Sequence, residues 1–169
     1  DKSFTRAEFF RQKLGERSIG SELVTVEEAV STKELGVFIT PKALPVCENL
    51  MYLRPRRLIA GIGCRRGVPE EEIKSALAAA CELIGQEISA VSLIASTIVK
   101  ADEEGIIALA DHLQIPTRFF KNEELEKTIE EYDLDQSDFV RSKIGVGNVC
   151  GAAAISCVER GVFALEKTK

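Results

Sequence analysis

From residue 56 onward, the sequence alternates between short apolar runs of strand length and amphipathic stretches of helix length. The first helical stretch carries Ile73, Leu77, Cys81 and Ile84 on one face, whereas residues 90–95 form an apolar run of strand length. Such alternation is typical of a layered α/β fold, with a largely parallel sheet and helices on both of its faces. The expected strands cover residues 57–62, 90–95, 117–120 and 162–166, and the expected helices cover residues 69–85, 103–113, 122–131 and 149–159. Residues 137–144 are expected to form a further helix or a turn.

The beginning of the chain lacks this regularity. A helix is expected over residues 4–14 and a short strand over residues 36–40, while residues 49–57 lead into the first strand of the regular region. We interpret residues 1–55 as the tail of an upstream, central region with its linker, and residues 56–169 as one α/β domain. The sequence does not begin with Met, so we expect a fragment or a processed chain.

Charge is distributed unevenly along the sequence. The formal net charge of −5 argues against general nucleic-acid binding. The acidic run over residues 123–138 is best explained as a solvated surface. An acidic protein with one focused group of arginines is suited to a small polyanion. The arginines of this group are Arg54, Arg56, Arg57, Arg65 and Arg66.

The cysteines and the single histidine, His112, restrict the chemistry further. Five widely spaced cysteines without a CxxC pair favour reduced thiols and a cytoplasmic protein, and no metal site is expected. We expect His112 to make a favourable contact at a helix C-terminus rather than to act in catalysis. No apolar run approaches the ~20 residues that a membrane-spanning helix needs, so no membrane association is expected.

A glycine-rich turn with two arginines lies between the first expected strand and the first expected helix. Its glycines permit close approach of the backbone, and its guanidiniums and the helix N-terminus supply positive potential for an anionic ligand. The spacing differs from the dinucleotide-binding fingerprint, and on spacing alone a purely structural turn is an equal alternative. The candidate ligand-binding residues of this turn are Gly61, Gly63, Cys64, Arg65, Arg66 and Gly67.

Two further loops are expected at the same edge of the sheet, because ligands of open parallel sheets bind beyond the carboxyl ends of the strands. Lys100 and Glu103 follow the second strand, and Gly147 and Asn148 precede the last helix. Lys100 and Glu103 form either a charge clamp with a general base or an ordinary acidic helix start, and spacing alone favours the helix start. Cys64 is a candidate nucleophile, although a small packing residue is the favoured interpretation.

Four segments in this order and spacing resemble a known family. The chain is similar to the C-terminal domain shared by the cobalamin-biosynthesis proteins CbiG and CobE, over about residues 54–167. The stretch before residue 54 resembles the central region of CbiG. The segments that carry the resemblance are Gly61-Ile62-Gly63-Cys64-Arg65-Arg66-Gly67, Ala95-Ser96-Thr97 with Lys100-Ala101-Asp102-Glu103, Phe119-Phe120, and Gly145-Val146-Gly147 with Val149-Cys150.

This resemblance implies a cobalt-precorrin-5A hydrolase, which opens a lactone on a cobalt-containing tetrapyrrole and releases acetaldehyde to give cobalt-precorrin-5B. Arg65 and Arg66 are then expected to bind substrate carboxylates, which guanidiniums hold bidentately. Glu103 is the candidate base, and Lys100 or the backbone N–H groups of residues 63–67 are candidates to stabilise the oxyanion. No cofactor is expected, because the substrate carries the cobalt.

Other interpretations predict different partners. A CobE-like module would bind a corrin intermediate, or dock with other enzymes of the pathway, without catalysis. A more distant alternative is a general α/β domain that binds a phosphorylated ligand. A homodimer is a further expectation.

Overall fold

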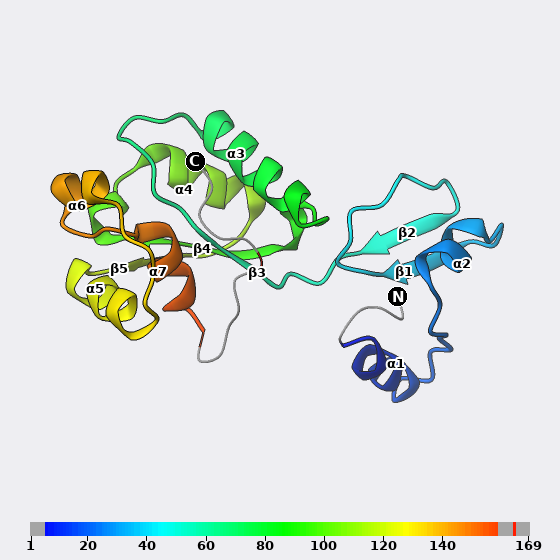
Figure 1. Cartoon of the computed structure of the whole chain (residues 1–169). Coiled ribbons are helices and arrows are strands. Elements are labelled where there is room, and N and C mark those ends of the chain that lie inside the picture. The colour runs from blue at the N-terminus through cyan, green and yellow to red at the C-terminus, as the bar shows by residue number, and fades with distance from the viewer. Residues whose placement is uncertain (1–5, 159–163, 165–169) are drawn as a thin grey trace. The chain divides into compact units, whose positions relative to one another are not determined.

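The computed structural model describes residues 6–158 and 164, and it divides the chain into two compact units, Asp1–Pro55 and Arg56–Lys169. Each unit has its own sheet (Figure 1). Within the described residues, no helix is long and apolar enough to cross a membrane.

The first unit contains a two-stranded parallel sheet. The predicted strand at residues 36–40 is confirmed, but its partner was missed, because residues 49–57 were interpreted as a lead-in to the next strand. A short strand of this kind depends on pairing with a distant segment, which its own sequence does not reveal. The elements of the unit are α1 (Ala7–Gly15), α2 (Val26–Ser31), β1 (Gly36–Ile39) and β2 (Leu50–Leu53).

The second unit is built around a three-stranded sheet in the order β3-β4-β5, with both strand pairs parallel. The expected layered α/β fold is therefore confirmed. The strands are β3 (Leu58–Gly61), β4 (Val91–Thr97) and β5 (Thr117–Phe120), and the helices are α3 (Glu70–Leu83), α4 (Glu104–Leu113), α5 (Asn122–Glu131), α6 (Asp138–Ile144) and α7 (Val149–Ile155), with short 3₁₀ turns η1 (Ile88–Ala90) and η2 (Ile98–Lys100).

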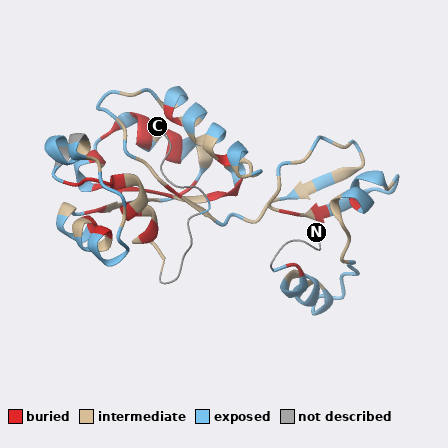
Figure 2. Cartoon of the chain, viewed as in Figure 1, coloured by how far each residue is buried: buried red, intermediate tan, exposed pale blue. Residues whose placement is uncertain are grey.

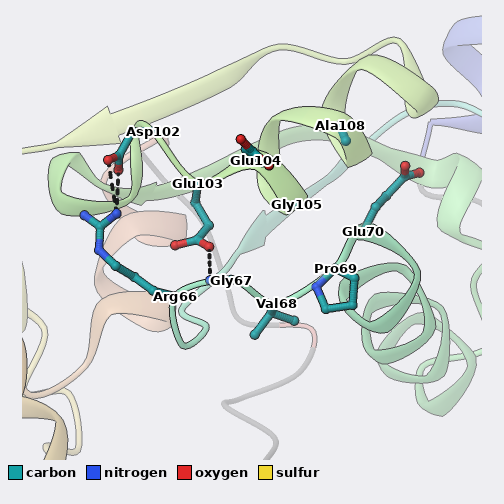
Figure 3. A pocket seen from close by; sticks show the side chains of 10 residues that line it. All are labelled: Arg66, Gly67, Val68, Pro69, Glu70, Asp102, Glu103, Glu104, Gly105 and Ala108. Carbon is teal, nitrogen blue, oxygen red and sulfur yellow. Dashed lines mark hydrogen bonds and ion pairs between the residues drawn. The ribbon is translucent and has the colours of Figure 1, made fainter.

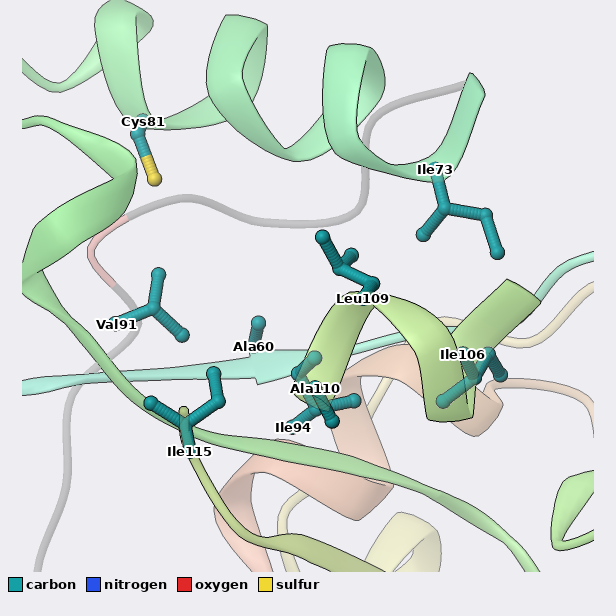
Figure 4. Packing of buried hydrophobic residues seen from close by; sticks show 9 residues of the cluster. All are labelled: Ala60, Ile73, Cys81, Val91, Ile94, Ile106, Leu109, Ala110 and Ile115. Atoms are coloured by element: carbon teal, nitrogen blue, oxygen red, sulfur yellow. The ribbon is translucent and has the colours of Figure 1, made fainter. Parts of the chain in front are cut away.

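Helices cover both faces of this sheet, as predicted (Figures 1 and 2). Side chains alternate between the faces of a strand, so Ile94 of β4 lies in one core and its neighbour Ala95 lies in the other. Helices α3 and α4 bury Ile73 and Leu109 against the first face (Figure 4). On the second face, α5 and α7 form the other core with Leu125. The two cores pack against the two faces of the sheet and so fix the place where the loops leave the carboxyl ends of the strands.

The end of the chain differs from the prediction in one respect. Helix α7 was expected to continue to residue 159, but it ends at Ile155. The N–H groups of Cys157 and Val158 bond to carbonyls three residues earlier, which tightens the last turn and closes the helix. The strand expected at residues 162–166 lies outside the described residues, apart from residue 164.

Candidate functional site

The loops that follow β3 and β4 leave the sheet at the same edge and are tied together there. The N–H of Ile62 donates to the carbonyl of Ala95 at 2.8 Å, and the hydroxyl of Ser96 donates to the carbonyl of Ile62 at 2.7 Å. Ser96 is fully buried. The glycine-rich turn therefore starts from a fixed point on the central strand.

Glu103 links the two loops through one carboxylate oxygen and holds Lys100 of its own loop with the other. Oε1 accepts a hydrogen bond from the backbone N–H of Gly67 at 2.5 Å, and Oε2 accepts one from Nζ of Lys100 at 2.9 Å (Figure 3 shows the first). Lys100 and Glu103 are both buried, at 5% and 4% exposed. The structure thus brings together Lys100, Glu103 and Gly67, three of the residues predicted from the sequence.

The surroundings of Glu103 favour its ionised form. The hydrogen bond from Lys100, followed by that from the Gly67 N–H, lowers the pKa of Glu103 below its ordinary value, although burial acts in the opposite direction. A general base works best with a pKa near the working pH, so this carboxylate is a weak proton acceptor. The geometry favours a positioning role for Glu103, and its role as a catalytic base stays a prediction.

Arg66 spans the same two loops on the outside of the molecule. Its Nη1 lies 3.0 Å from an oxygen of Asp102, and its Nη2 donates to the carbonyl of Val99 at 3.1 Å (Figure 3 shows the pair with Asp102). Arg66 also lowers the pKa of Asp102. The charge of this arginine is therefore balanced by a carboxylate of the protein itself.

Arg65 differs from its neighbour. Its side chain is exposed, and it makes no hydrogen bond or ion pair with any residue that the structure describes. Within the glycine-rich turn, it is the arginine whose guanidinium is available to a ligand.

A hollow of about 480 Å³ lies beside the turn, between the N-termini of α3 and α4 (Figure 3). One arginine, Arg66, lines it, and that arginine is already paired. The surplus of negative charge makes the hollow unfavourable for a polyanion. Its acidic lining residues are Glu70, Asp102, Glu103 and Glu104.

The glycines of the turn have different structural roles. Gly67 has a φ of +74° with open space around it, so it is required for the backbone conformation. A side chain at Gly61 would overlap the backbone carbonyl of Cys150, and one at Gly63 would lie 3.1 Å from its sulfur. Gly61 and Gly63 thus permit close packing of α7, whereas the sequence predicted that they serve the approach of a ligand.

Cys64 is half-buried and packs against the core of α3 and α4. Burial is the main cause that raises the pKa of its thiol, and the opposing effect of Lys100 is smaller. A thiol with a raised pKa is a poor nucleophile at neutral pH. These observations favour the packing alternative for Cys64.

The polar groups of the loop before α7 form hydrogen bonds with other residues of the protein. Asn148 is buried; its Nδ2 donates to the carbonyl of Asp135, and its Oδ1 accepts from the N–H of Gly151, each at 2.9 Å. Gly147 is also buried, and its carbonyl accepts a hydrogen bond from the N–H of Ser137 at 2.9 Å. The predicted binding roles of Gly147 and Asn148 have no support in this geometry.

Sequence reasoning missed the partners that hold the turn. No contact was predicted for Asp102, for Ser96 or for the carbonyl of Val99. An aspartate and an arginine 36 residues apart carry no local signal of pairing. Across residues 6–158 and 164, no group of three or more His, Cys, Asp or Glu residues could hold a metal ion.

Comparison with known proteins identifies the second unit. Residues 58–169 match the sequence model of the family described as "Cobalamin synthesis G C-terminus". The resemblance predicted from the sequence is confirmed by this match, by two curated relatives and by one solved structure.

The two relatives are considerably longer proteins. The cobalt-precorrin-5A hydrolase of Salmonella typhimurium (strain LT2) is 38% identical over 102 residues, which are 60% of this chain and 28% of that protein. The probable cobalt-precorrin-5A hydrolase of Methanocaldococcus jannaschii is 29% identical over 115 residues, 68% of this chain and 36% of that protein. The matched region is thus about a third of each relative's length.

The solved structure is the crystal structure of CobE, a protein from the cobalamin (vitamin B12) biosynthetic pathway. It superimposes with a TM-score of 0.55 at 33% sequence identity, over 60% of this chain and 70% of that chain. The likeness therefore extends over most of CobE.

Proposed function

The chain belongs to the cobalamin synthesis G C-terminal family, and from this premise we propose that it forms the C-terminal part of a cobalt-precorrin-5A hydrolase. The proposed reaction consumes one water to open the substrate's lactone and releases a two-carbon fragment as acetaldehyde, leaving cobalt-precorrin-5B. The substrate brings the cobalt, so the proposal requires no resident cofactor.

One observation carries the proposal: Glu103 fixes the turn at residues 63–67 from inside, and Arg65 on its surface makes no hydrogen bond or ion pair with any described residue. A tetrapyrrole of this pathway carries several peripheral carboxylates. A guanidinium matches a carboxylate bidentately, and a preformed turn reduces the ordering cost of binding. We assign Arg65 to one of these carboxylates.

The charges around the turn support a direction of approach. The hollow beside Arg66 is lined by four carboxylates, Glu70, Asp102, Glu103 and Glu104, and would repel an acidic substrate. Arg66 helps to neutralise Asp102 at the edge of that hollow. The substrate's carboxylate is therefore proposed to meet Arg65 outside the hollow.

The catalytic roles within this site are also proposals. Lactone opening needs stabilisation of a developing oxyanion, for which the buried ammonium of Lys100 and the backbone N–H groups of residues 63–66 are the candidates, because the N–H of Gly67 already donates to Glu103. Glu103 is proposed to hold Lys100 and Gly67 in place, because its lowered pKa makes it a weak base.

The state of Glu103 also favours a second function, a corrin-binding module without catalysis. Both of its oxygens are occupied, and its pKa is low. On this alternative, the domain binds the tetrapyrrole or docks with other enzymes of the pathway, and the chemistry takes place elsewhere. Cytoplasmic location and a homodimer stay predictions under both functions.

The two functions are separated by adding cobalt-precorrin-5A to the chain and measuring acetaldehyde, with the Salmonella typhimurium hydrolase as the positive control. Release of acetaldehyde by the chain supports the hydrolase. Binding of the tetrapyrrole without release shows that the chain holds the substrate without a complete catalytic site, as the module predicts, and failure to bind would contradict both functions.

A further inference from the structure

Two apolar residues, Ile98 and Val99, are exposed directly after the end of the central strand β4. The four residues before them, Ile94 to Thr97, are fully buried, and Lys100 after them is 5% exposed. Ile98 and Val99, between these buried positions, are 51% and 36% exposed. Two neighbouring apolar side chains are thus exposed between buried positions, where a ligand can reach them.

These two residues lie directly beside the glycine-rich turn. Nη2 of Arg66 donates to the carbonyl of Val99 at 3.1 Å, which fixes η2 against the turn that carries Arg65. Neither Ile98 nor Val99 lines the acidic hollow. The surface around η2 thus carries two apolar side chains, and the turn bound to it carries Arg65, whose side chain is exposed.

This combination matches the chemistry of one class of ligand, a macrocycle with apolar faces and carboxylates at its periphery. We propose that Ile98 and Val99 form an apolar contact surface for the face of the corrin-type macrocycle, while Arg65 binds a peripheral carboxylate. This inference rests on the proposed function and adds to it the residues that would recognise the ring itself.

The physical properties of the two side chains suit this role. Val and Ile are stiff at χ1, so little side-chain entropy is lost when a flat ligand covers them. A covered apolar surface next to Arg65 also excludes water from its contact with a carboxylate, which strengthens that contact. The apolar surface and the charge are expected to act together on affinity.

The test titrates two corrinoids with the full chain: cobyrinic acid, whose side chains end in carboxylic acids, and cobinamide, whose ring side chains are amides. The variant Ile98→Ser/Val99→Ser is expected to weaken binding of both by about tenfold, because the ring contact is common to them. Leu83→Ser is the matched control: Leu83 is 70% exposed at the far end of α3, and its loss is expected to leave both affinities unchanged.

A second variant, Ile98→Thr/Val99→Thr, keeps the β-branched shape while adding hydroxyls, and circular dichroism checks that each variant is folded. Unchanged affinity of both double variants, with Arg65→Ala still weakened toward cobyrinic acid, would overturn this inference and leave the proposed function standing. Equal weakening by Leu83→Ser would also overturn it. Failure of the unmodified chain to bind either corrinoid would overturn the proposed function as well.

Discussion

The carboxylate of Glu103 accepts a hydrogen bond from the backbone N–H of Gly67 at 2.5 Å and so joins two loops 36 residues apart in the sequence. Lys100 holds the second carboxylate oxygen. Because the hydrogen bond between Gly67 and Glu103 joins a backbone N–H to a carboxylate, it fixes the turn without using either of its arginines. The central claim is that this fixed turn presents Arg65 to a carboxylate of the substrate.

Replacing Glu103 by Gln should destabilise the second unit strongly. Gln keeps an oxygen for the Gly67 N–H but leaves the buried ammonium of Lys100 without its counterion, and breaking a buried pair costs about 3–5 kcal/mol. Denaturant unfolding followed by circular dichroism measures the free energy of unfolding.

The double variant Glu103→Gln/Lys100→Met is the matched control, because it removes both charges. It should recover a large part of the lost stability, as apolar replacements of buried pairs often do. If the double variant is less stable than Glu103→Gln alone, the cost does not arise from the unpaired charge of Lys100, and this interpretation is wrong.

The stability of the second unit should decrease in acid in a way that depends on Glu103. The folded-state pKa of Glu103 lies below its ordinary value of 4.5. The contribution of Glu103 to the free energy of unfolding is therefore complete above about pH 4.5. It is lost as the pH falls through the folded-state pKa. Unfolding free energies measured from pH 7 to pH 3 should show this loss in the unmodified chain.

In the same series, the stability difference between the unmodified chain and Glu103→Gln/Lys100→Met isolates this group, since Asp102 is present in both. The difference should become less favourable to the unmodified chain as the pH falls. A difference that stays constant across this range would show that Glu103 is not held by the contacts described.

Two glycines of the turn, Gly61 and Gly67, should respond differently to replacement by alanine. Gly61→Ala places a methyl group on the carbonyl of Cys150, so its cost should reach the upper end of the about 1–3 kcal/mol expected for overpacking. Gly67→Ala meets open space and pays only for a positive φ, about 1–2 kcal/mol. Thermal and denaturant unfolding of both variants measure the two costs, and a milder effect at Gly61 would contradict the close packing of α7.

The regular part of the fold was predictable because its signals are local. The amphipathic periodicity of Asn122–Glu131 and the β-prone residues of Thr117–Phe120 after Pro116 indicate their elements without reference to the rest of the chain. Strand β2 was missed because its pairing with β1 is non-local. The early end of α7 was missed because it depends on backbone bonding in its last turn.

The candidate site was predictable in its place but not in its internal contacts. The convergence of the loops after β3 and β4 follows from a parallel sheet, whose strands end at one edge. The pairing of Arg66 with Asp102, which distinguishes it from Arg65, depends on the distance between those loops. The roles of Gly61 and Gly63 depend on where α7 packs, and sequence spacing does not contain that information.

The most direct test of the central claim is the dissociation constant of cobyrinic acid for the unmodified chain and for Arg65→Ala. A charge-assisted hydrogen-bonded contact is worth about 1.5–3 kcal/mol, so Arg65→Ala should bind roughly ten- to a hundredfold more weakly. Arg65→Lys should lie between them, since an ammonium lacks the bidentate geometry.

Two controls accompany this measurement. Arg17→Ala removes the same charge from an exposed residue of the first unit and should leave the affinity for cobyrinic acid unchanged. Cobinamide, whose ring side chains are amides, should bind Arg65→Ala and the unmodified chain equally. A selective loss of cobyrinic acid affinity in Arg65→Ala is the predicted result, and an affinity within twofold of the unmodified chain would contradict the account.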